Sequence, residues 1–183
     1  TMNSMFQKVE QNEDGTYTAY IANARHLENL NFFGNEGTRS NQICVTRAVQ
    51  TADILWQDDL EFHQESQSEA YGTEMTKAYG SSQIYLGTWS PVPTGSFIPI
   101  DNSSLRCYDG NGYTIVGIRI RERSDQNSRG AALFFGNTDL EIRNLKLKNP
   151  DVLASNGNAG ILISGDSSQE VQQVKLSRIT VYG

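Results

Sequence analysis

Three segments in the second half of the chain repeat one pattern of aliphatic residues. Each has an aliphatic side chain at the second, fifth and seventh of seven positions, and the segments are residues 114–120, 141–147 and 175–181. The last two aliphatic positions alternate as in a β-strand, and the pair of residues before them predicts a bend. The spacing is 27 residues from Ile115 to Ile142 and 34 from Ile142 to Leu176. A unit of this size is too small to bury its own apolar face, so it has to stack on its neighbours.

Two short apolar runs lie between these segments and close on glycine, at residues 130–136 and 159–165. Such runs predict buried strands followed by turns. Several short strands per repeat predict an all-β chain that folds as a right-handed parallel β-helix, or β-solenoid. A β-sandwich is the competing fold, since it also consists of many short strands with turn signals. Recurrence of the same local pattern favours the solenoid.

The first half of the chain predicts one short helix ahead of the strands. Residues 23–30 place Ala24, Leu27 and Leu30 at helical spacing, and Asn23 is a suitable N-cap. Residues 45–56 follow as the first predicted strands. The helix is therefore expected to cap the solenoid and to cover its first strand edges.

We expect one domain over residues 1–183. Its parts are a cap region at 1–44, first strands at 45–56, an insert at 57–95 and repeats at 96–183. Because the last repeat stops at Gly183, we expect the chain to be a piece of a longer protein.

The insert at 57–95 combines acidic and aromatic residues. Long loops on a rigid scaffold often carry binding surfaces, and aromatic rings can stack on sugars or anchor a protein partner. The alternative is that the rings pack the insert onto the scaffold. The acidic residues are Asp58, Asp59, Glu61, Glu65 and Glu69, and the aromatic ones are Tyr71, Tyr79, Tyr85 and Trp89.

Charge and cysteine content exclude several classes of function. The net charge of −6 argues against unspecific nucleic-acid binding, which needs clustered Lys and Arg. Membrane insertion is not expected, because no run approaches the roughly 20 apolar residues of a membrane span. Cys44 and Cys107 lack the paired spacing of a zinc site. They form either a disulfide or two small buried hydrophobic residues.

The sequence contains no recognisable catalytic, metal or cofactor motif. His26 and His63 are the only histidines and do not form a His-Glu-x-x-His motif. Phosphate-binding glycine motifs are also missing. The run Asp109–Gly112 lacks the later ligands of a calcium loop and predicts a tight turn between strands. We assign no catalytic residue, metal ligand or cofactor, and leave the binding residues open.

The second half of the chain resembles the GLUG-type repeats of Gram-positive bacterial surface proteins. The resemblance covers about residues 97–183, and it departs from the family where Ala131, Ala132 and Ala159 replace glycines. In the first half, the Leu27–Leu30 and Thr51–Trp56 phrases resemble the N-terminal capping region of large exported proteins. The matching phrases are Phe97–Ile100, Tyr108–Ile115, Ala132–Gly136, Ile142–Leu145 with Asn149 and Val152, and Ala159–Gly165.

The resemblance implies a non-catalytic, extracellular module at the bacterial cell surface, used in adhesion or as a structural stalk. A glycan or a host or matrix protein is the expected partner, and a spacer without any partner is a further alternative. The rival is a polysaccharide-active lyase or hydrolase, because parallel β-helices also carry such enzymes. That rival requires acidic and basic side chains to meet in one groove. Its candidates are Arg119, Arg121 and Arg123 with Asp58, Asp59 and Glu61.

Overall fold

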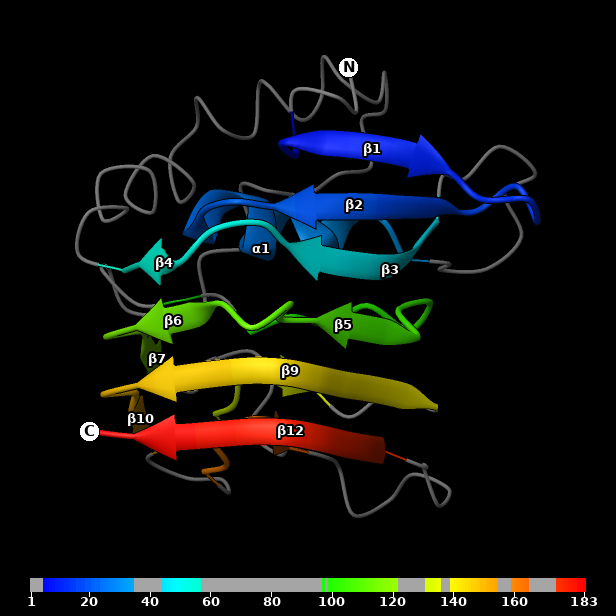
Figure 1. Cartoon of the computed structure of the whole chain (residues 1–183). Helices are drawn as coiled ribbons and strands as arrows, with labels where there is room; N and C mark the ends of the chain where they lie inside the picture. The colour runs from blue at the N-terminus through cyan, green and yellow to red at the C-terminus, as the bar shows by residue number, and fades with distance from the viewer. Residues whose placement is uncertain are drawn as a thin grey trace, which may run out of the picture.

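An eight-stranded mixed sheet organises the protein in the computed structural model (Figure 1). The structure describes residues 5–34, 44–56, 97, 99–121, 131–135, 139–154, 159–164 and 174–183. These residues form mostly sheet and almost no helix, so the prediction of a mainly β chain is confirmed. The strands of the main sheet are β1 (Lys8–Gln11), β2 (Tyr17–Ile21), β3 (Val45–Gln50), β4 (Ile54–Leu55), β5 (Cys107–Asp109), β6 (Thr114–Val116), β9 (Leu140–Lys148) and β12 (Val174–Tyr182).

β9 is the strand on which the main sheet is built. Along the sheet the order is β1-β2-β3-β5-β9-β6-β4, and β12 pairs with β9 as well. β9 is long enough to pair with both β5 and β6, so that Tyr108 lies beside Ile142 and Ile115 beside Leu147. Every pair in this sheet is parallel except β1–β2. Figure 1 shows β1 and β12 at opposite edges.

Two smaller parallel sheets accompany the main sheet. β7 (Arg119–Arg121) pairs with β10 (Asp151–Leu153), so that Ile120 lies beside Val152. β8 (Phe134–Phe135) pairs with β11 (Ile163–Ser164). Each smaller sheet has two strands.

The predicted right-handed parallel β-helix, or β-solenoid, is wrong. The described residues form a mixed sheet, and no solenoid is found among them. β1 runs antiparallel to β2 because residues 12–16 close a tight turn, in which Gly15 has φ +85° and Asp14 accepts a hydrogen bond from the Thr16 N–H. The two smaller sheets have two strands each, and isolated parallel bridges at Phe97 and Ile100 extend them.

Pairing also corrects the alignment of the repeat. The second and third segments are neighbours as predicted, because Ile142 lies beside Leu176 and Leu147 beside Val181. The first segment is out of register, since Tyr108 and not Ile115 lies beside Ile142. The chain leaves the main sheet after Val116. Ile118 follows that strand, and Ile120 lies in β7 of a smaller sheet. A turn between β5 and β6 displaced the pattern, and the sequence alone did not show this.

The predicted short helix is confirmed. α1 spans Ala24–Asn29, and the side chain of Asn23 caps it by accepting a hydrogen bond from the His26 N–H at 2.9 Å. A 3-10 helix, η2 (Leu30–Phe32), follows directly. Ala24, Leu27 and Leu30 are all buried in the core. Asparagine suits this position because its side-chain oxygen satisfies an N–H that the first helical turn leaves unpaired.

The two apolar runs closing on glycine differ in burial. Residues 131–135 are all buried, as predicted, and Phe134 packs against Tyr108 with ring centroids 5.3 Å apart. The second run is not buried, since Ala159 and Ile161 are exposed. Its strand β11 has β8 as its one neighbour among the described strands, so one side of the run lacks a covering strand.

The predicted bend occurs inside β9 and β12. Asn144 has φ +53° and Arg178 has φ +54°, each in the polar pair between the second and fifth positions of its segment. These are left-handed conformations, which asparagine and glycine adopt more readily than arginine. The backbone of Arg178 is therefore strained, whereas Asn144 is well suited to the same left-handed conformation.

Replacing Arg178 separates this backbone strain from side-chain effects. We expect Arg178→Gly to be more stable than Arg178→Ala by about 0.5–1 kcal/mol, because glycine lacks the Cβ that opposes positive φ. Both variants remove the same exposed side chain, so the comparison cancels its contribution. Urea unfolding followed by circular dichroism measures the difference. Equal stability of the two variants would show that residue 178 carries no backbone strain.

Candidate functional site

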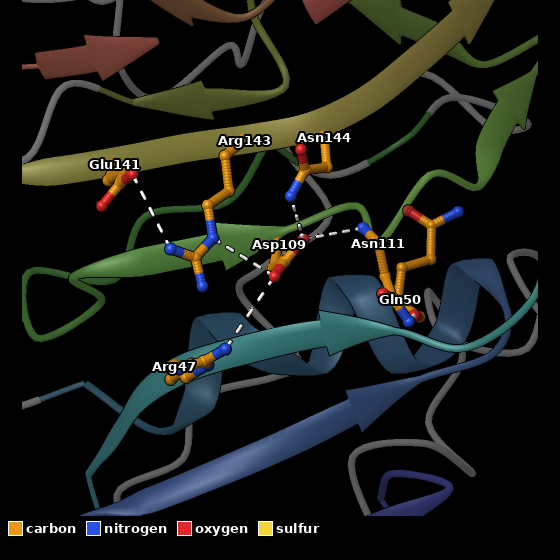
Figure 2. A network of polar contacts seen from close by, with 7 residues as sticks. All are labelled: Arg47, Gln50, Asp109, Asn111, Glu141, Arg143 and Asn144. Carbon is orange, nitrogen blue, oxygen red and sulfur yellow. Dashed lines mark hydrogen bonds and ion pairs between the residues drawn. The ribbon is translucent and has the colours of Figure 1, made fainter. Parts of the chain in front are cut away.

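A cluster of charged and amide side chains lies across β3, β5 and β9 (Figure 2). We call it the Asp109 cluster. Asp109, at the end of β5, is the centre of the cluster. Arg143 on β9 lies directly beside it, and Arg47 on β3 and Glu141 on β9 lie beside Cys107, two residues earlier on β5. Its members are Arg47, Asp109, Asn111, Glu141, Arg143 and Asn144.

The turn after β5 sets the position of Asp109. Asn111 and Gly112 have φ +54° and +81°, and the Tyr113 N–H donates to the Gly110 carbonyl at 2.9 Å. Gly110 is required because a Cβ there would lie 2.5 Å from the Asn144 carbonyl oxygen of β9. The prediction of a tight turn at Asp109–Gly112 is therefore confirmed. Within the described residues, no group of three or more His, Cys, Asp or Glu could hold a metal ion.

Hydrogen bonds and an ion pair occupy both oxygens of the Asp109 carboxylate. Oδ1 accepts from the Asn111 N–H at 2.8 Å and from the Asn144 amide at 3.2 Å. Oδ2 accepts from Nε of Arg143 at 3.2 Å, and Nη2 of Arg47 lies 3.8 Å from it. Figure 2 shows these groups converging on Asp109 from both neighbouring strands. The carboxylate is therefore already engaged by side chains and backbone of its own chain.

The electrostatic environment keeps Asp109 ionised. Burial by itself would raise the pKa of its carboxyl, but the hydrogen bonds from Asn111, Asn144 and Arg143 outweigh burial and lower the pKa. A general acid at neutral pH needs the opposite shift. A nucleophile or general base also needs a free oxygen lone pair facing its substrate. The cluster is arranged to stabilise structure and not to transfer protons.

A buried layer of hydrogen bonds lies behind the cluster. The Tyr108 hydroxyl donates to Oε1 of Gln50 at 2.8 Å, and the Asn111 amide donates to the Gln50 carbonyl at 3.2 Å. Burial, with the nearby Asp109 charge, raises the pKa of Tyr108, so the phenol stays protonated. The same turn that positions Asp109 is thus also attached to β3.

Two of the three arginines named for the enzyme alternative lie among the described residues. Arg119 and Arg121 share one side of β7, with buried Ile120 between them. Arg121 makes a two-pronged pair with Asp151 on β10, with Nη1–Oδ1 and Nη2–Oδ2 distances of 3.1 and 3.0 Å. This pair joins the two strands of one small sheet. Arg123, His63 and the whole predicted insert, with Asp58, Asp59, Glu61, Glu65, Glu69 and its four aromatic residues, lie outside the described residues.

Neither cysteine is part of a disulfide, and both are half-buried. The structure therefore gives neither the disulfide nor the full burial that the sequence left open. Burial raises the pKa of the Cys107 thiol, although Arg143 and Arg47 act in the opposite direction. A thiol with a raised pKa is less often ionised at neutral pH, so Cys107 is a poor nucleophile.

His26 is a packing residue and not a ligand. Its Nδ1 accepts a hydrogen bond from the Ala22 N–H at 3.1 Å, which requires the neutral ring. Burial, together with the neighbouring Arg25 charge, lowers the pKa of His26 to about 4. The half-buried ring on α1 therefore packs as a neutral imidazole.

Sequence reasoning missed the Asp109 cluster. It assigned the Asp-Gly-Asn-Gly run to a turn, and that assignment explains the backbone but not the carboxylate. Arg47 and Arg143 are distant in sequence, and only the strand register brings them to Asp109. Comparison of the chain with family models, with curated proteins and with solved structures finds no match.

Removing the Asp109 charge tests the structural role of the cluster. We expect Asp109→Asn to lower the free energy of unfolding at pH 7 by about 1–2 kcal/mol, because charge-assisted hydrogen bonds are lost. Glu141→Gln is the matched control and is expected to cost under about 0.5 kcal/mol, since Glu141 is 3.9 Å from Arg143 and partly exposed. Urea unfolding of the three proteins gives both values.

The pH dependence of the same comparison gives a second check. Because the folded-state pKa of Asp109 lies below its ordinary value of 3.8, its contribution is complete above that value. The stability difference between wild type and Asp109→Asn should shrink as the pH falls below 3.8 and through the folded-state pKa. A stability difference that stays constant down to pH 2 would show that the ionised Asp109 carboxylate is not its source.

His26 should make the protein less stable in mild acid. Between its ordinary pKa of 6.5 and the lowered value of about 4, only the unfolded chain takes up the proton. We expect wild type to lose about 1–2 kcal/mol relative to His26→Asn between pH 7 and pH 4.5. Asparagine retains an acceptor for the Ala22 N–H and does not titrate. Parallel loss of stability in both proteins would show that His26 is not responsible.

Proposed function

We propose that this chain is a non-catalytic, extracellular module of a bacterial cell-surface protein, used for adhesion or as a structural stalk. The observation that carries the proposal is the state of the Asp109 carboxylate. This carboxylate is buried, and both of its oxygens are engaged internally. A group so placed holds strands together and is not available to a substrate.

The Arg121–Asp151 pair supports the same conclusion. A polysaccharide-active enzyme on this chain was expected to bring Arg121 and acidic side chains together in one groove. Instead, both Nη groups of Arg121 donate to the Asp151 carboxylate. Nη1 also donates to the Asp151 backbone carbonyl at 3.1 Å. An arginine held in two directions by one neighbour is suited to joining β7 to β10. These contacts favour a structural role for Arg121 over the role that the enzyme alternative would give it.

The extracellular location and the surface-protein context rest on the resemblance of residues 97–183 to GLUG-type repeats. Among the described residues, no helix is long and apolar enough to cross a membrane. A glycan or a host or matrix protein is the partner that we propose for an adhesive role. The predicted insert at 57–95, with its four aromatic residues, is the segment that we would test first for contact.

A binding screen with three proteins tests adhesion. The intact chain, a variant with 57–95 replaced by a Gly-Ser linker, and a variant with Tyr71, Tyr79, Tyr85 and Trp89 changed to alanine are applied to glycan and extracellular-matrix arrays. We expect the intact chain to bind and both variants to lose binding, while circular dichroism shows that all three fold. Binding that survives both changes would exclude the insert as the contact surface.

Turnover assays separate the adhesive module from the enzyme alternative. We expect no release of reducing ends or unsaturated products when the intact chain is incubated with neutral and acidic polysaccharides. Sustained turnover that falls on Arg119→Ala or Arg121→Ala substitution would contradict the non-catalytic proposal.

A further inference from the structure

Large exposed hydrophobic side chains gather on the last strands of the protein. β12 alone carries Leu176, Val181 and Tyr182, with exposed fractions of 51 %, 43 % and 44 %. Leu153 on β10 and Ile161 before β11 are exposed as well. Contiguous exposed apolar residues on a protein surface commonly mark an interaction site.

The exposed residues of β12 continue the buried rows of the core. Leu176 lies beside Ile142, Ile179 beside Leu145 and Val181 beside Leu147. The β9 member of every pair is fully buried. β12 therefore repeats the apolar face of β9, but its face is open to solvent. One more strand beside β12 would bury that face in the same way.

β12 also has a free edge within the described part of the chain. Its one described neighbour is β9, and the Asn149 N–H donates to the Tyr182 carbonyl at 2.8 Å across that pair. Because the backbone groups of successive strand residues point to opposite sides, those of Val181 point away from β9. Such an edge is a template for pairing with another strand.

We propose that a second copy of this chain pairs its β12 antiparallel with this β12 and forms a two-fold symmetric dimer. The left-handed residue Arg178 interrupts the alternation of β12, so the residues on either side of a central Arg178–Ile179 pair match their own reverse. Leu176 then lies opposite Val181 of the second copy, and Ser177 lies opposite Thr180. At the centre, Arg178 lies opposite Ile179 of the second copy. On either side of that pair, Leu176 and Val181 meet on the inner face, and the small hydroxyl residues meet on the outer face.

A contact between a cation and an aromatic ring favours the same register. It places Lys175 opposite Tyr182 of the second copy, twice in the symmetric dimer. The protein already contains this pair in its own antiparallel strands, where Lys8 is directly opposite Tyr20 and its Nζ lies 5.3 Å from the ring centroid. Cross-strand pairs of a cation and an aromatic ring are favourable in such geometry.

The opposite edge of the sheet is a poor alternative surface for the second copy. At β1 the ammonium of Lys8 pairs with Glu10, and Glu10 accepts a hydrogen bond from the Tyr20 hydroxyl at 2.9 Å. Met5 and Phe6 at that edge are buried. A head-to-tail contact would leave the apolar residues of β12 facing polar ones. A two-fold contact instead joins the same patch on both copies.

Sedimentation equilibrium of the intact chain, from about 1 to 100 µM, tests the dimer. We expect a monomer–dimer equilibrium for wild type and at least tenfold weaker association for Leu176→Lys and Val181→Lys. Leu55→Lys is the matched control, because Leu55 on β4 is 44 % exposed and lies outside β12. Association should strengthen with added salt, since Arg178 of each copy lies near the two-fold axis and salt screens their repulsion.

Two results would overturn the proposal. One is a wild-type chain that stays monomeric throughout this concentration range. The other is a dimer that Leu176→Lys and Val181→Lys leave as tight as Leu55→Lys does. Register is checked by mixing a Ser177→Cys chain with a Thr180→Cys chain, both with Cys44 and Cys107 replaced by serine. A mixed disulfide dimer is expected, and equal cross-linking of each chain with itself would exclude this register.

Discussion

The structure depends on the pairing of β9 with strands on both of its sides. β5 and β6 lie along one side of β9, and β12 lies along the other. Four aliphatic side chains of β9, Leu140, Ile142, Leu145 and Leu147, are buried. Burying one such side chain stabilises a protein by about 1.5–3 kcal/mol, whereas an exposed ion pair contributes about 0–1 kcal/mol. The apolar face of β9 therefore contributes more than the charged cluster on its other face.

The Asp109 cluster fixes the register of the strands, whereas the apolar face of β9 supplies most of the stability. Gly110 lies so close to β9 that no residue with a Cβ fits there. At the same place, the Asn144 side chain of β9 donates a hydrogen bond to Asp109. Arg143 and Arg47 hold the same carboxylate from the two neighbouring strands. A slip of one residue in the register would separate all of these groups. The cluster thus selects one register among those that aliphatic packing alone would tolerate.

The sequence predicted local elements better than their assembly. Asn23 with Ala24, Leu27 and Leu30 defines a helix through short-range spacing alone, and that helix is present. The tight turn at Asp109–Gly112 and the bend at Asn144 were likewise predictable, because both are local backbone effects. The solenoid was not correct, since the antiparallel β1–β2 pair and the two-stranded sheets depend on which strands meet. Asp109, Arg47 and Arg143 were missed for the same reason: residues far apart in sequence reveal a site only when the register is known.

Amide hydrogen exchange of the intact chain measured by NMR tests most directly whether β9 is the strand on which the structure depends. In this account, the amides of β9 open only with global unfolding, while those of β1 at the sheet edge exchange through smaller local openings. The predicted result is slowest exchange at Ile142, Leu145 and Leu147. Exchange of these amides as fast as those of β1 would contradict the central place of β9.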